Sequence, residues 1–543
     1  MKIHRRLLFL TFMTLTLATS GCAQNTSTPV TFRQENVATL AAQNARIREV
    51  GEAMQGGGWN VYGNGFLGDW FQASGGEIEI NIRAAGDPSA NIYPLMRVWV
   101  NEKMMREFSV ASTEYKDYAL STLVPKGITR IEIEFINDTN GETPDRNLRV
   151  MEIAVSNAKL SEHIPKIGEV EIAKHRMGDL IVRGKPGTKV HVKQLRHEFP
   201  FGTCIAHEVF LPLPENAPST AVEDRKKYLE IARTWFNAAT PENSLKWYHT
   251  EKKQGEVSYE DADRVLAWAK KNEIQVRGHT LFWAVDQYVQ DWVKGLDDAT
   301  LKAKIKARID DIVPRYKGRI DEWDVNNEML HGDYYGQRLG AQINADMFIL
   351  AKAANPNAVL YVNDYAVLSG PNAGKYFEQV QQLKKMGAPV GGVGFQGHFG
   401  YGIDLRHVKC TLDKFAELKL PLKVTEFDLK TGNPQDKAKQ MADFYRTCFA
   451  HPSIEGITMW GFWQGSDWIP EAAIFAKDWT PTPAAMAYHE LVFKEWWTDT
   501  QAVIPASGVL RLRAFYGRHQ VVCGDRKKVV ELKKNEQRAE AAL

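Results

Sequence analysis

Hydrophobic and polar positions alternate with a period of two along the first third of the chain. Short segments of this kind, separated by turns rich in Gly and Asn, are EIEINIRAAG (77–86), LMRVWV (95–100), ITRIEIEF (128–135) and NLRVMEIAV (147–155). Each segment places apolar side chains on one face and polar side chains on the other, as strands with one buried face do. The pattern predicts an antiparallel β-sandwich over residues 46–160.

The pattern changes after a strand-like connector at residues 161–196. Helical segments such as EDRKKYLEIARTWF (223–236) now alternate with short apolar strands. Eight predicted strands end in FPFGTCI, FNAAT, IQVRGHT, EWDVNNE, LYVND, VGFQGH, KVTEFD and ITMWGF. Eight strands with intervening helices over about 300 residues are typical of a (β/α)8 TIM barrel. We therefore predict an α/β fold, with the barrel at residues 197–498.

Strand character returns at residues 499–543, which predicts a C-terminal β extension and tail. The segments GVLRLRAFYG and HQVVCGDRKKVVEL read as strands. The final stretch, KKNEQRAEAAL, is rich in charge, and terminal stretches of this kind are commonly poorly ordered. We expect it to be frayed.

The first 22 residues have the pattern of a signal peptide. Lys2, Arg5 and Arg6 precede an apolar run at residues 7–18, which is too short for a permanent membrane helix. The run ends in Thr-Ser-Gly-Cys22, which resembles a bacterial lipobox, with Thr where Leu is usual. Two outcomes stay open: a lipid on Cys22 that attaches the protein to the outer membrane or cell surface, or periplasmic or secreted release. Residues 23–45 read as a polar linker.

The overall charge argues against nucleic-acid binding. The 543 residues carry 68 basic and 66 acidic side chains, for a net charge of +2, and no block of one sign stands out. Export permits disulfides, but the sequence does not specify any pairing of Cys204, Cys410, Cys448 and Cys523. We find neither HExxH nor a Cys/His zinc pattern, and predict no metal in the barrel.

Two glutamates are candidates for catalysis because each stands at the end of a predicted strand. Glu328 ends EWDVNNE and Glu426 lies in VTEFD, 98 residues later. At about 30–35 residues per βα unit, this spacing places them on strands 4 and 7, across the mouth of the barrel. Either residue alone could be half of an ion pair. Together, two carboxylates across a cleft are the groups that hydrolyse glycosidic bonds.

These motifs resemble glycoside hydrolase family 10, the endo-β-1,4-xylanases, over residues 195–498. WDVNNE is similar to the family's acid/base strand, which implies that Asn327 contacts a sugar 2-hydroxyl and that Glu328 is the acid/base. VTEFD is similar to its nucleophile strand, which implies that Glu426 is the nucleophile and that Asp428 is a supporting acid beside it.

Further motifs extend the resemblance to substrate-binding residues. TPENSLKW implies that Glu242, Asn243 and Lys246 bind the sugar on the glycone side. RGHTLFW supplies His279 and Trp283, although Ala284 stands where the family often has His.

Three later motifs complete the implied site. GFQGH supplies Gln396 and His398, and the resemblance implies that His398 hydrogen-bonds the nucleophile. ITMWGFWQGSDW supplies Trp460 and Trp468 as walls of the glycone sites. Tyr365 in VNDY adds a stacking surface on the aglycone side.

The resemblance implies retaining hydrolysis of internal β-1,4 bonds of xylan, which requires a carboxyl separation of about 5–5.5 Å. It favours xylan because Glu242, Asn243, Lys246 and Trp468 leave little room for a C6 hydroxymethyl group. Two alternatives remain: a non-catalytic glycan-binding protein on a barrel scaffold, and a retaining glycosidase for another β-1,4-glycan.

The predicted sandwich has features of a carbohydrate-binding module. FINDTNGETPDRNLRVMEIAV (135–155) resembles the last strands of xylan-binding modules. Candidate stacking residues are Trp59, Tyr62, Trp70 and Phe71. Candidate hard-oxygen ligands for a structural Ca²⁺ are Asn137, Asp138 and Asp145. The alternative is that these are core aromatics and turn residues.

Overall fold

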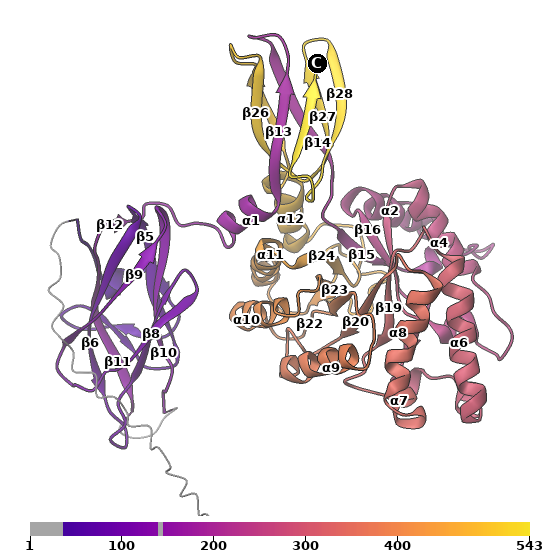
Figure 1. Ribbon diagram of the computed structural model, residues 1–543, viewed down its shortest axis with the longest axis horizontal. Helices are drawn as coiled ribbons and strands as arrows, with labels where there is room; N and C mark the ends of the chain where they lie inside the picture. Colours follow the sequence, from indigo (N-terminus) through magenta and orange to yellow (C-terminus); the bar gives the residue numbers. More distant parts are fainter. Residues whose placement is uncertain (1–35, 140–144) are drawn as a thin grey trace, which may run out of the picture. The chain divides into compact units, whose positions relative to one another are not determined.

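The computed structural model describes residues 36–139 and 145–543, which form two compact units (Figure 1). The first unit reaches to Pro165 and the second spans Lys166–Leu543. Across the described residues, we find no helix with the length and apolarity needed to cross a membrane. Within the same residues, all four cysteines are free thiols, and only that of Cys410 is exposed.

The N-terminal unit is a sandwich of two antiparallel sheets, as the alternating pattern predicts. One sheet contains β1 (Ala38–Ala41), β3 (Glu52–Ala53), β4 (Trp59–Val61), β6 (Gly76–Asp87), β9 (Lys116–Val124) and β11 (Asn147–Val155). The other contains β2 (Ile47–Arg48), β5 (Gly65–Ala73), β7 (Leu95–Val100), β8 (Lys103–Ser109), β10 (Gly127–Phe135) and β12 (Ala158–Leu160). Alternate residues of β6 and β10, such as Ile80 and Ile131, fill the core between the sheets.

The second unit contains the predicted (β/α)8 barrel. Its eight parallel strands are β15 (Phe201–Ile205), β16 (Ala238–Pro241), β17 (Gln275–Gly278), β19 (Glu322–Asn327), β20 (Val359–Asp364), β21 (Gly392–Phe395), β23 (Leu422–Leu429) and β24 (Ile454–Met459). Each strand pairs with the next in chain order, and β24 pairs with β15 to close the ring. The fold class is therefore confirmed.

Helices surround this ring on the outside (Figure 1). The longer ones are α2 (Ser219–Trp235), α4 (Glu260–Lys271), α6 (Asp298–Arg315), α8 (Gln342–Ala354), α9 (Ala373–Lys385), α10 (Leu405–Ala416), α11 (Pro434–Ala450) and α12 (Pro483–Glu490). The sequence of α10 illustrates why they form: Asp404 caps its N-terminus, and Val408, Leu412 and Phe415 recur at helical spacing to bury one face. Turns at the strand ends include η2 (His207–Phe210) and α3 (Trp247–Thr250).

Strands from both sides of the barrel in sequence combine into a separate β module within the second unit. They are β13 (Met177–Arg183), β14 (Lys189–His197), β25 (Asp499–Val503), β26 (Val509–Phe515), β27 (Gly517–Cys523), β28 (Arg526–Leu532) and β29 (Arg538–Ala542). The expected fraying of the last residues is wrong. β29 pairs in parallel with β13, because Ala541 joins Leu180 and Val182 in the small core of the module.

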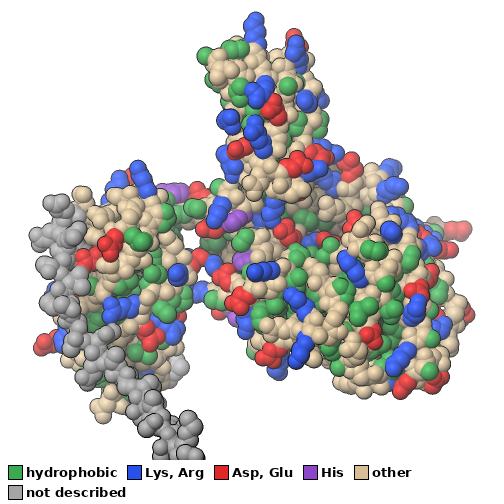
Figure 2. Space-filling model, viewed as in Figure 1, with side chains coloured by type: hydrophobic (Ala, Val, Ile, Leu, Met, Phe, Trp, Pro, Cys, Tyr) green, Lys and Arg blue, Asp and Glu red, His purple; other side chains and the backbone are tan. Residues whose placement is uncertain are grey.

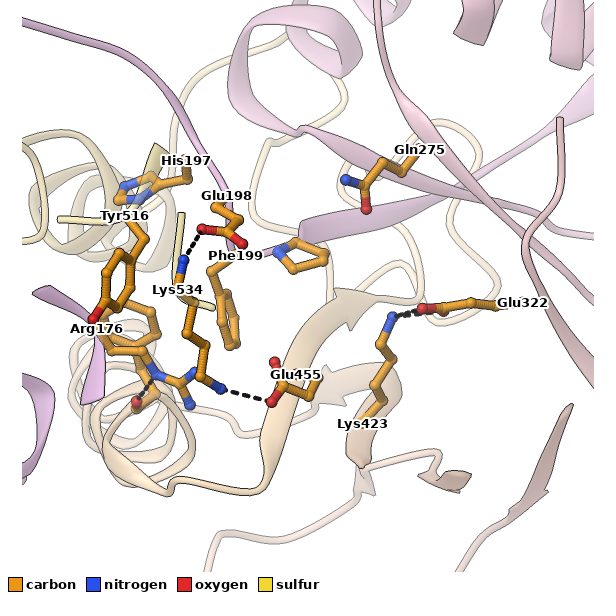
Figure 3. A pocket seen from close by; sticks show the side chains of 12 residues that line it. Arg176, His197, Glu198, Phe199, Gln275, Glu322, Lys423, Glu455, Tyr516 and Lys534 are labelled. Atoms are coloured by element: carbon orange, nitrogen blue, oxygen red, sulfur yellow. Dashed lines mark hydrogen bonds and ion pairs between the residues drawn. The ribbon is translucent and has the colours of Figure 1, made fainter. Parts of the chain in front are cut away.

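A pocket lies at the amino-terminal end of the barrel strands, against the β module (Figure 3). Its charged side chains are already paired: Lys423 contacts Glu322, and Lys534 contacts Glu455. Polar groups at this end of a TIM barrel serve stability, whereas active sites lie at the carboxyl ends of the strands. The candidate site is therefore at the opposite end.

The surface agrees with a net charge close to zero. On the face in Figure 2, basic and acidic side chains are interspersed, and no broad field of one sign covers the barrel or the β module. Nothing on this face indicates a polyanion as a partner.

Candidate active site

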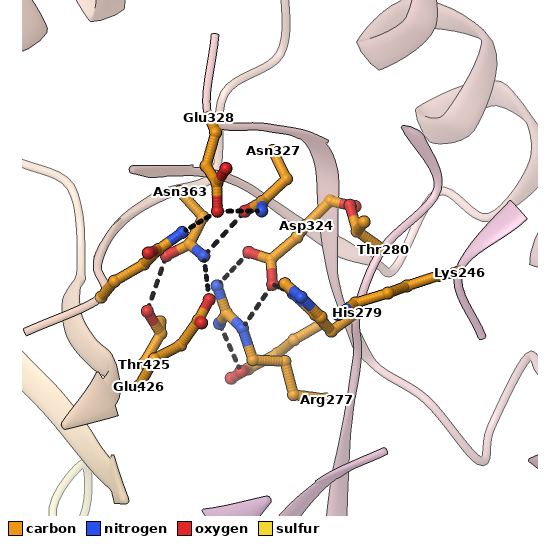
Figure 4. Close-up of polar contacts among 12 residues, drawn as sticks. Lys246, Arg277, His279, Thr280, Asp324, Asn327, Glu328, Asn363, Thr425 and Glu426 are labelled. Carbon is orange, nitrogen blue, oxygen red and sulfur yellow. Dashed lines mark hydrogen bonds and ion pairs between the residues drawn. The ribbon is translucent and has the colours of Figure 1, made fainter. Parts of the chain in front are cut away.

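The two predicted catalytic glutamates meet at the mouth of the barrel (Figure 4). Glu328 follows β19, the fourth strand, and Glu426 lies within β23, the seventh strand. Glu426 is 4% exposed and Glu328 is half-buried. The sequence spacing therefore predicted the correct pair of strands.

A chain of side-chain amides connects the two carboxylates. Asn363, at the end of β20, donates from Nδ2 to Glu426 Oε1 at 2.7 Å and to Asn327 Oδ1 at 2.9 Å. Asn327 donates in turn to Glu328 Oε1 at 3.1 Å. The hydroxyl of Thr425 donates to Asn363 Oδ1 at 2.6 Å, which fixes the orientation of the Asn363 amide. Sequence reasoning missed Asn363, because Asn-Asp after a strand is also a common turn sequence.

Glu328 sits in an environment that favours its protonated form. Burial raises the pKa of Glu328, and the nearby charge of Glu426 raises it further. Donors from Gln396 Nε2 and Trp283 Nε1, each at 2.8 Å, oppose this shift without cancelling it. The backbone of Glu328 has φ +61°, a strained value for a residue with a side chain and one that recurs at functional sites.

Glu426 lies in an environment that favours its charged form. Burial alone would raise its pKa, but electrostatic interactions with His279, His398 and Lys246, together with a hydrogen bond from His398, reverse the effect, and the pKa of Glu426 lies below its ordinary value. Two carboxyl groups in one cleft therefore have pKa values that are pushed apart. This is the condition under which one serves as an acid and the other as an anion.

His398 lies between the carboxylates of Asp428 and Glu426. Its Nδ1 is 2.7 Å from Asp428 Oδ2, and its Nε2 is 3.5 Å from Glu426 Oε2. Although burial opposes protonation, these two carboxylates raise the pKa of His398 to about 10. The shorter contact is thus with Asp428, and the contact with Glu426 is a longer ion pair than the sequence resemblance implied.

A buried ion pair orients the second histidine. His279 Nδ1 is 2.9 Å from Asp324 Oδ2, and Asp324 is also paired with Arg277. All three side chains are less than 7% exposed. Arg277 and Asp324 were not among the predicted residues, although both face the barrel interior. Arg277 stands two positions before His279, and Asp324 stands four positions before Glu328. Alternation along each strand was the signal that could have found them.

Glu242, Asn243 and Lys246 lie together after β16. Lys246 Nζ donates to Asn243 Oδ1 at 3.0 Å and stands 4.5 Å from the ring centroid of Trp283. Burial lowers the pKa of Lys246 and raises that of Glu242. Lys246 thus presents an ammonium group beside an aromatic face, next to the two carboxylates that the amide chain connects.

Aromatic side chains surround the carboxylates. Trp460 is 7% exposed and lies 5.2 Å from His279, ring to ring. Trp468 is 54% exposed and donates from Nε1 to Asp428 Oδ2 at 3.0 Å. Tyr365 stacks on His331 with a centroid distance of 3.6 Å, so its ring is held in place by a neighbour that the sequence analysis did not single out.

The proposed carbohydrate-binding residues of the N-terminal unit fall into different environments. Phe71 is fully buried in the core, so it cannot stack on a ligand, and this prediction is wrong. Trp59 and Trp70 are half-buried and lie under arginine side chains. Tyr62 is 46% exposed. Cys22, the proposed lipid site, lies outside the described residues.

The candidate calcium ligands divide in a similar way. Asn137 Oδ1 accepts from the backbone N–H of Leu95 at 2.7 Å, and its Nδ2 donates to the Tyr93 carbonyl at 3.0 Å. The Asn137 amide is thus engaged in hydrogen bonds that hold the loop in place. Asp138 and Asp145 remain suitable by chemistry, because Ca²⁺ prefers carboxylate oxygens. Thr139 joins them by donating to Asp145 Oδ1 at 3.3 Å.

Comparisons with known sequences agree with this geometry. Residues 195–491, more than half of the chain, match the model of glycosyl hydrolase family 10. Residues 79–167 match that of a Ca-dependent, xylan-binding carbohydrate-binding module.

Endo-1,4-beta-xylanase 1 of Arabidopsis thaliana is 34% identical over 340 residues, 62% of this chain and 34% of the relative. Anti-sigma-I factor RsgI6 of Acetivibrio thermocellus is 36% identical over 340 residues, 62% of this chain and 43% of the relative. The chain thus spans less than half the length of either relative.

A solved structure supports the same assignment. Native xylanase 10B from Thermotoga maritima superposes with a TM-score of 0.50 at 27% identity, covering 55% of this chain and 95% of that one. By its sequence over residues 195–491, the chain belongs to glycosyl hydrolase family 10.

Proposed function

We propose that the protein is an exported endo-1,4-β-xylanase that acts with retention of anomeric configuration. The observation that carries the proposal is the opposite perturbation of two connected carboxyl groups: the pKa of Glu328 is raised and that of Glu426 is lowered. A retaining glycosidase needs this asymmetry, together with a carboxyl separation of about 5–5.5 Å. One amide chain through Asn327 and Asn363 joins the two groups.

In the first step, Glu328 donates its proton to the glycosidic oxygen while Glu426 attacks the anomeric carbon. The bond from carbon to the leaving oxygen breaks, a bond from carbon to Glu426 forms, and the aglycone departs with the proton. Asn363 and His398 hold Glu426 as an anion for this attack.

In the second step, Glu328 is a carboxylate and accepts a proton from water. The hydroxide so formed attacks the same carbon from the opposite face, and the bond to Glu426 breaks. Glu328 keeps the proton that it took from water, and Glu426 leaves as a carboxylate, which restores the starting state. Two inversions give net retention.

We assign the surrounding side chains to sugar binding. Asn327 contacts the 2-hydroxyl, and Glu242, Asn243 and Lys246 bind the glycone-side sugar. Gln396 and Trp283 orient Glu328 as well as the sugar, and His279 binds the sugar. Trp460 and Trp468 offer flat faces to the glycone, and Tyr365 offers one to the aglycone, because aromatic faces pack on the apolar faces of pyranose rings.

We further propose that the N-terminal unit binds xylan in a calcium-dependent way, which the match of residues 79–167 supports. Asp138 and Asp145 would hold the ion, and the ion would supply a positive charge that sugar hydroxyls can ligate. A signal peptide at residues 1–22, with a lipid on Cys22, would keep both units outside the cytoplasm.

Product analysis tests this function. We expect the protein to release short xylo-oligosaccharides from arabinoxylan and glucuronoxylan, and none from cellulose, and the Glu426→Ala variant to release none from any polymer. Products from cellulose would favour a retaining glycosidase for another β-1,4-glycan. Binding of xylan without cleavage would favour a glycan-binding protein, a reading raised by the relative named as an anti-sigma factor.

A further inference from the structure

Two histidines and an aspartate converge beside the barrel mouth, and no catalytic step uses them. His207 belongs to η2 after the first strand, His249 to α3 after the second, and Asp261 to α4. One ligand atom from each lies within 4.8 Å of the other two. This is the one such group of His, Cys, Asp and Glu found among the described residues.

The distances are close to those of a metal site. Asp261 Oδ2 is 3.0 Å from His249 Nε2 and 3.8 Å from His207 Nε2, and the two imidazole centroids are 4.6 Å apart. Ligands around a tetrahedral Zn²⁺, with bonds of about 2.0–2.1 Å, lie about 3.3 Å from one another. Small side-chain rotations would therefore bring the three atoms around one ion.

A carboxylate and a guanidinium group stand next to the ligand atoms of this cluster. His207 is 8% exposed, and its Nδ1 makes no hydrogen bond within the described residues, although Glu208 Oε2 stands 3.3 Å away. Asp261 Oδ1 accepts from Arg264 Nη1 at 2.7 Å, which leaves Oδ2 toward the histidines. Ligating histidines commonly direct their second nitrogen to a carboxylate, and ligating carboxylates are themselves hydrogen-bonded.

We propose that His207 Nε2, His249 Nε2 and Asp261 Oδ2 form a binding site for a divalent transition-metal ion, Zn²⁺ in the first place, with water as a fourth ligand. The donor set of two imidazoles and one carboxylate suits this class of ion and not Ca²⁺ or Mg²⁺, which prefer oxygen. The proposal does not depend on the xylanase function.

The site would brace the part of the mouth that carries Lys246. α3 begins directly after this lysine, and His249 lies within that helical turn. The backbone N–H of Glu242 donates to the Ile205 carbonyl at 3.1 Å, so the first two strand ends are already joined. A metal ion between His207 and His249 would join the turns that follow them.

Metal titration of the full chain tests the site. The protein, without a histidine tag, is stripped with EDTA and exchanged into excess CaCl₂, which occupies calcium sites in the N-terminal unit. We expect calorimetry to show one equivalent of bound Zn²⁺ and the melting temperature to rise with it. His249→Gln and Asp261→Asn should each weaken Zn²⁺ binding at least about 100-fold, and Glu208→Gln about 10-fold, as loss of an outer partner does.

His191→Gln is the matched control. His191 also contacts an aspartate, Asp499 at 2.6 Å, but lies in the β module, so this variant should bind Zn²⁺ like the parent. Equal Zn²⁺ binding by His249→Gln and His191→Gln, or no saturable binding by the parent, would overturn the site.

Binding of Co²⁺ tests the metal site in the parent protein, without any variant. Co²⁺ added to the stripped parent should produce the strong visible absorption of a four-coordinate ion, and Zn²⁺ should abolish it. A spectrum identical to that of free aqueous Co²⁺ would contradict the proposal, whatever the folding of the variants.

Discussion

Asn363 donates its side-chain amide to Oε1 of Glu426 at 2.7 Å, although the two residues stand 63 positions apart. Both side chains are almost fully buried, so water cannot replace this bond. The amide thus holds the proposed nucleophile in place and favours its charged form.

We expect Asn363→Ala to lower the turnover number on xylan by about 10- to 150-fold. A hydrogen bond to a charged group contributes about 1.5–3 kcal/mol, and each 1.36 kcal/mol is tenfold in rate. Steady-state kinetics on xylotetraose measures the effect. Asn237→Ala is the control, because its amide bonds the backbone at the other end of the barrel, and its turnover should match the parent. Equal losses in both variants would mean that Asn363 acts through stability alone.

Two substrates with different leaving groups distinguish the role of Glu328 from that of Glu426. Glu328→Ala should cut the rate on xylan by about 10²- to 10⁴-fold, the usual contribution of a general acid. A dinitrophenyl xylobioside needs no proton to leave, so its first step should stay fast, and added azide should give a β-glycosyl azide. Glu273→Gln, which removes a surface contact with Arg518, should behave like the parent. An unchanged rate on xylan would rule out Glu328 as the acid.

The pH dependence follows from the two opposite shifts. Glu328 must be protonated, so the rate falls as pH rises through its raised pKa, and Glu426 must be ionised, so the rate falls as pH drops through its lowered pKa. Gln396 donates to Glu328 and lowers its pKa. Gln396→Ala should therefore move the alkaline limb of kcat/KM to higher pH, as measured on xylotetraose. A move to lower pH would contradict this assignment.

Stability should depend on pH through His398. Its pKa is about 10 in the folded protein and 6.5 as the ordinary value. A raised folded pKa gives stability that is complete below 6.5 and is lost as pH rises to about 10. The free energy of unfolding in urea should fall over this interval, and Asp428→Asn should flatten the fall because it removes the closest partner. His407→Gln serves as the control, because the ring of His407 contacts the backbone carbonyl of Val367 at 3.0 Å. A fall in Asp428→Asn as steep as in the parent would exclude His398 as the source.

Calcium removal should affect binding to insoluble xylan and leave catalysis on soluble substrate intact. We expect EDTA to release the protein from insoluble xylan, and CaCl₂ alone to restore binding, if residues 79–167 act as their family match suggests. Rates on xylotetraose should differ less than twofold between the EDTA-stripped protein and the same protein after addition of CaCl₂. Asp138→Asn and Asp145→Asn should abolish the calcium effect. Binding that is insensitive to EDTA would argue against a calcium-dependent module.

Much of the barrel could be predicted from sequence, because each strand is a short apolar run that ends in a polar residue at the active end. Glu328 and Glu426 stand out for that reason. Asn363 and Asp324 do not, since their roles depend on hydrogen bonds to partners far away in sequence. The same holds for His207 and His249, which are 42 positions apart and form no local motif.

The strands that flank the barrel were predicted, but their pairing was not, for a related reason. The pairing of β13 with β29 joins residues more than 350 positions apart, and no local pattern records which strands will meet. The charge of the final stretch suggested fraying, whereas a few buried alanines and leucines decide that it pairs.

That pairing fixes an order of events during biosynthesis. β13 and β14 leave the ribosome before any barrel strand, yet their partners are made only after the eighth strand is complete. The edges of β13 and β14 therefore stay unpaired while the entire barrel is synthesised. The module closes only when Ala542 has been added, and until then its open strand edges can pair with wrong partners.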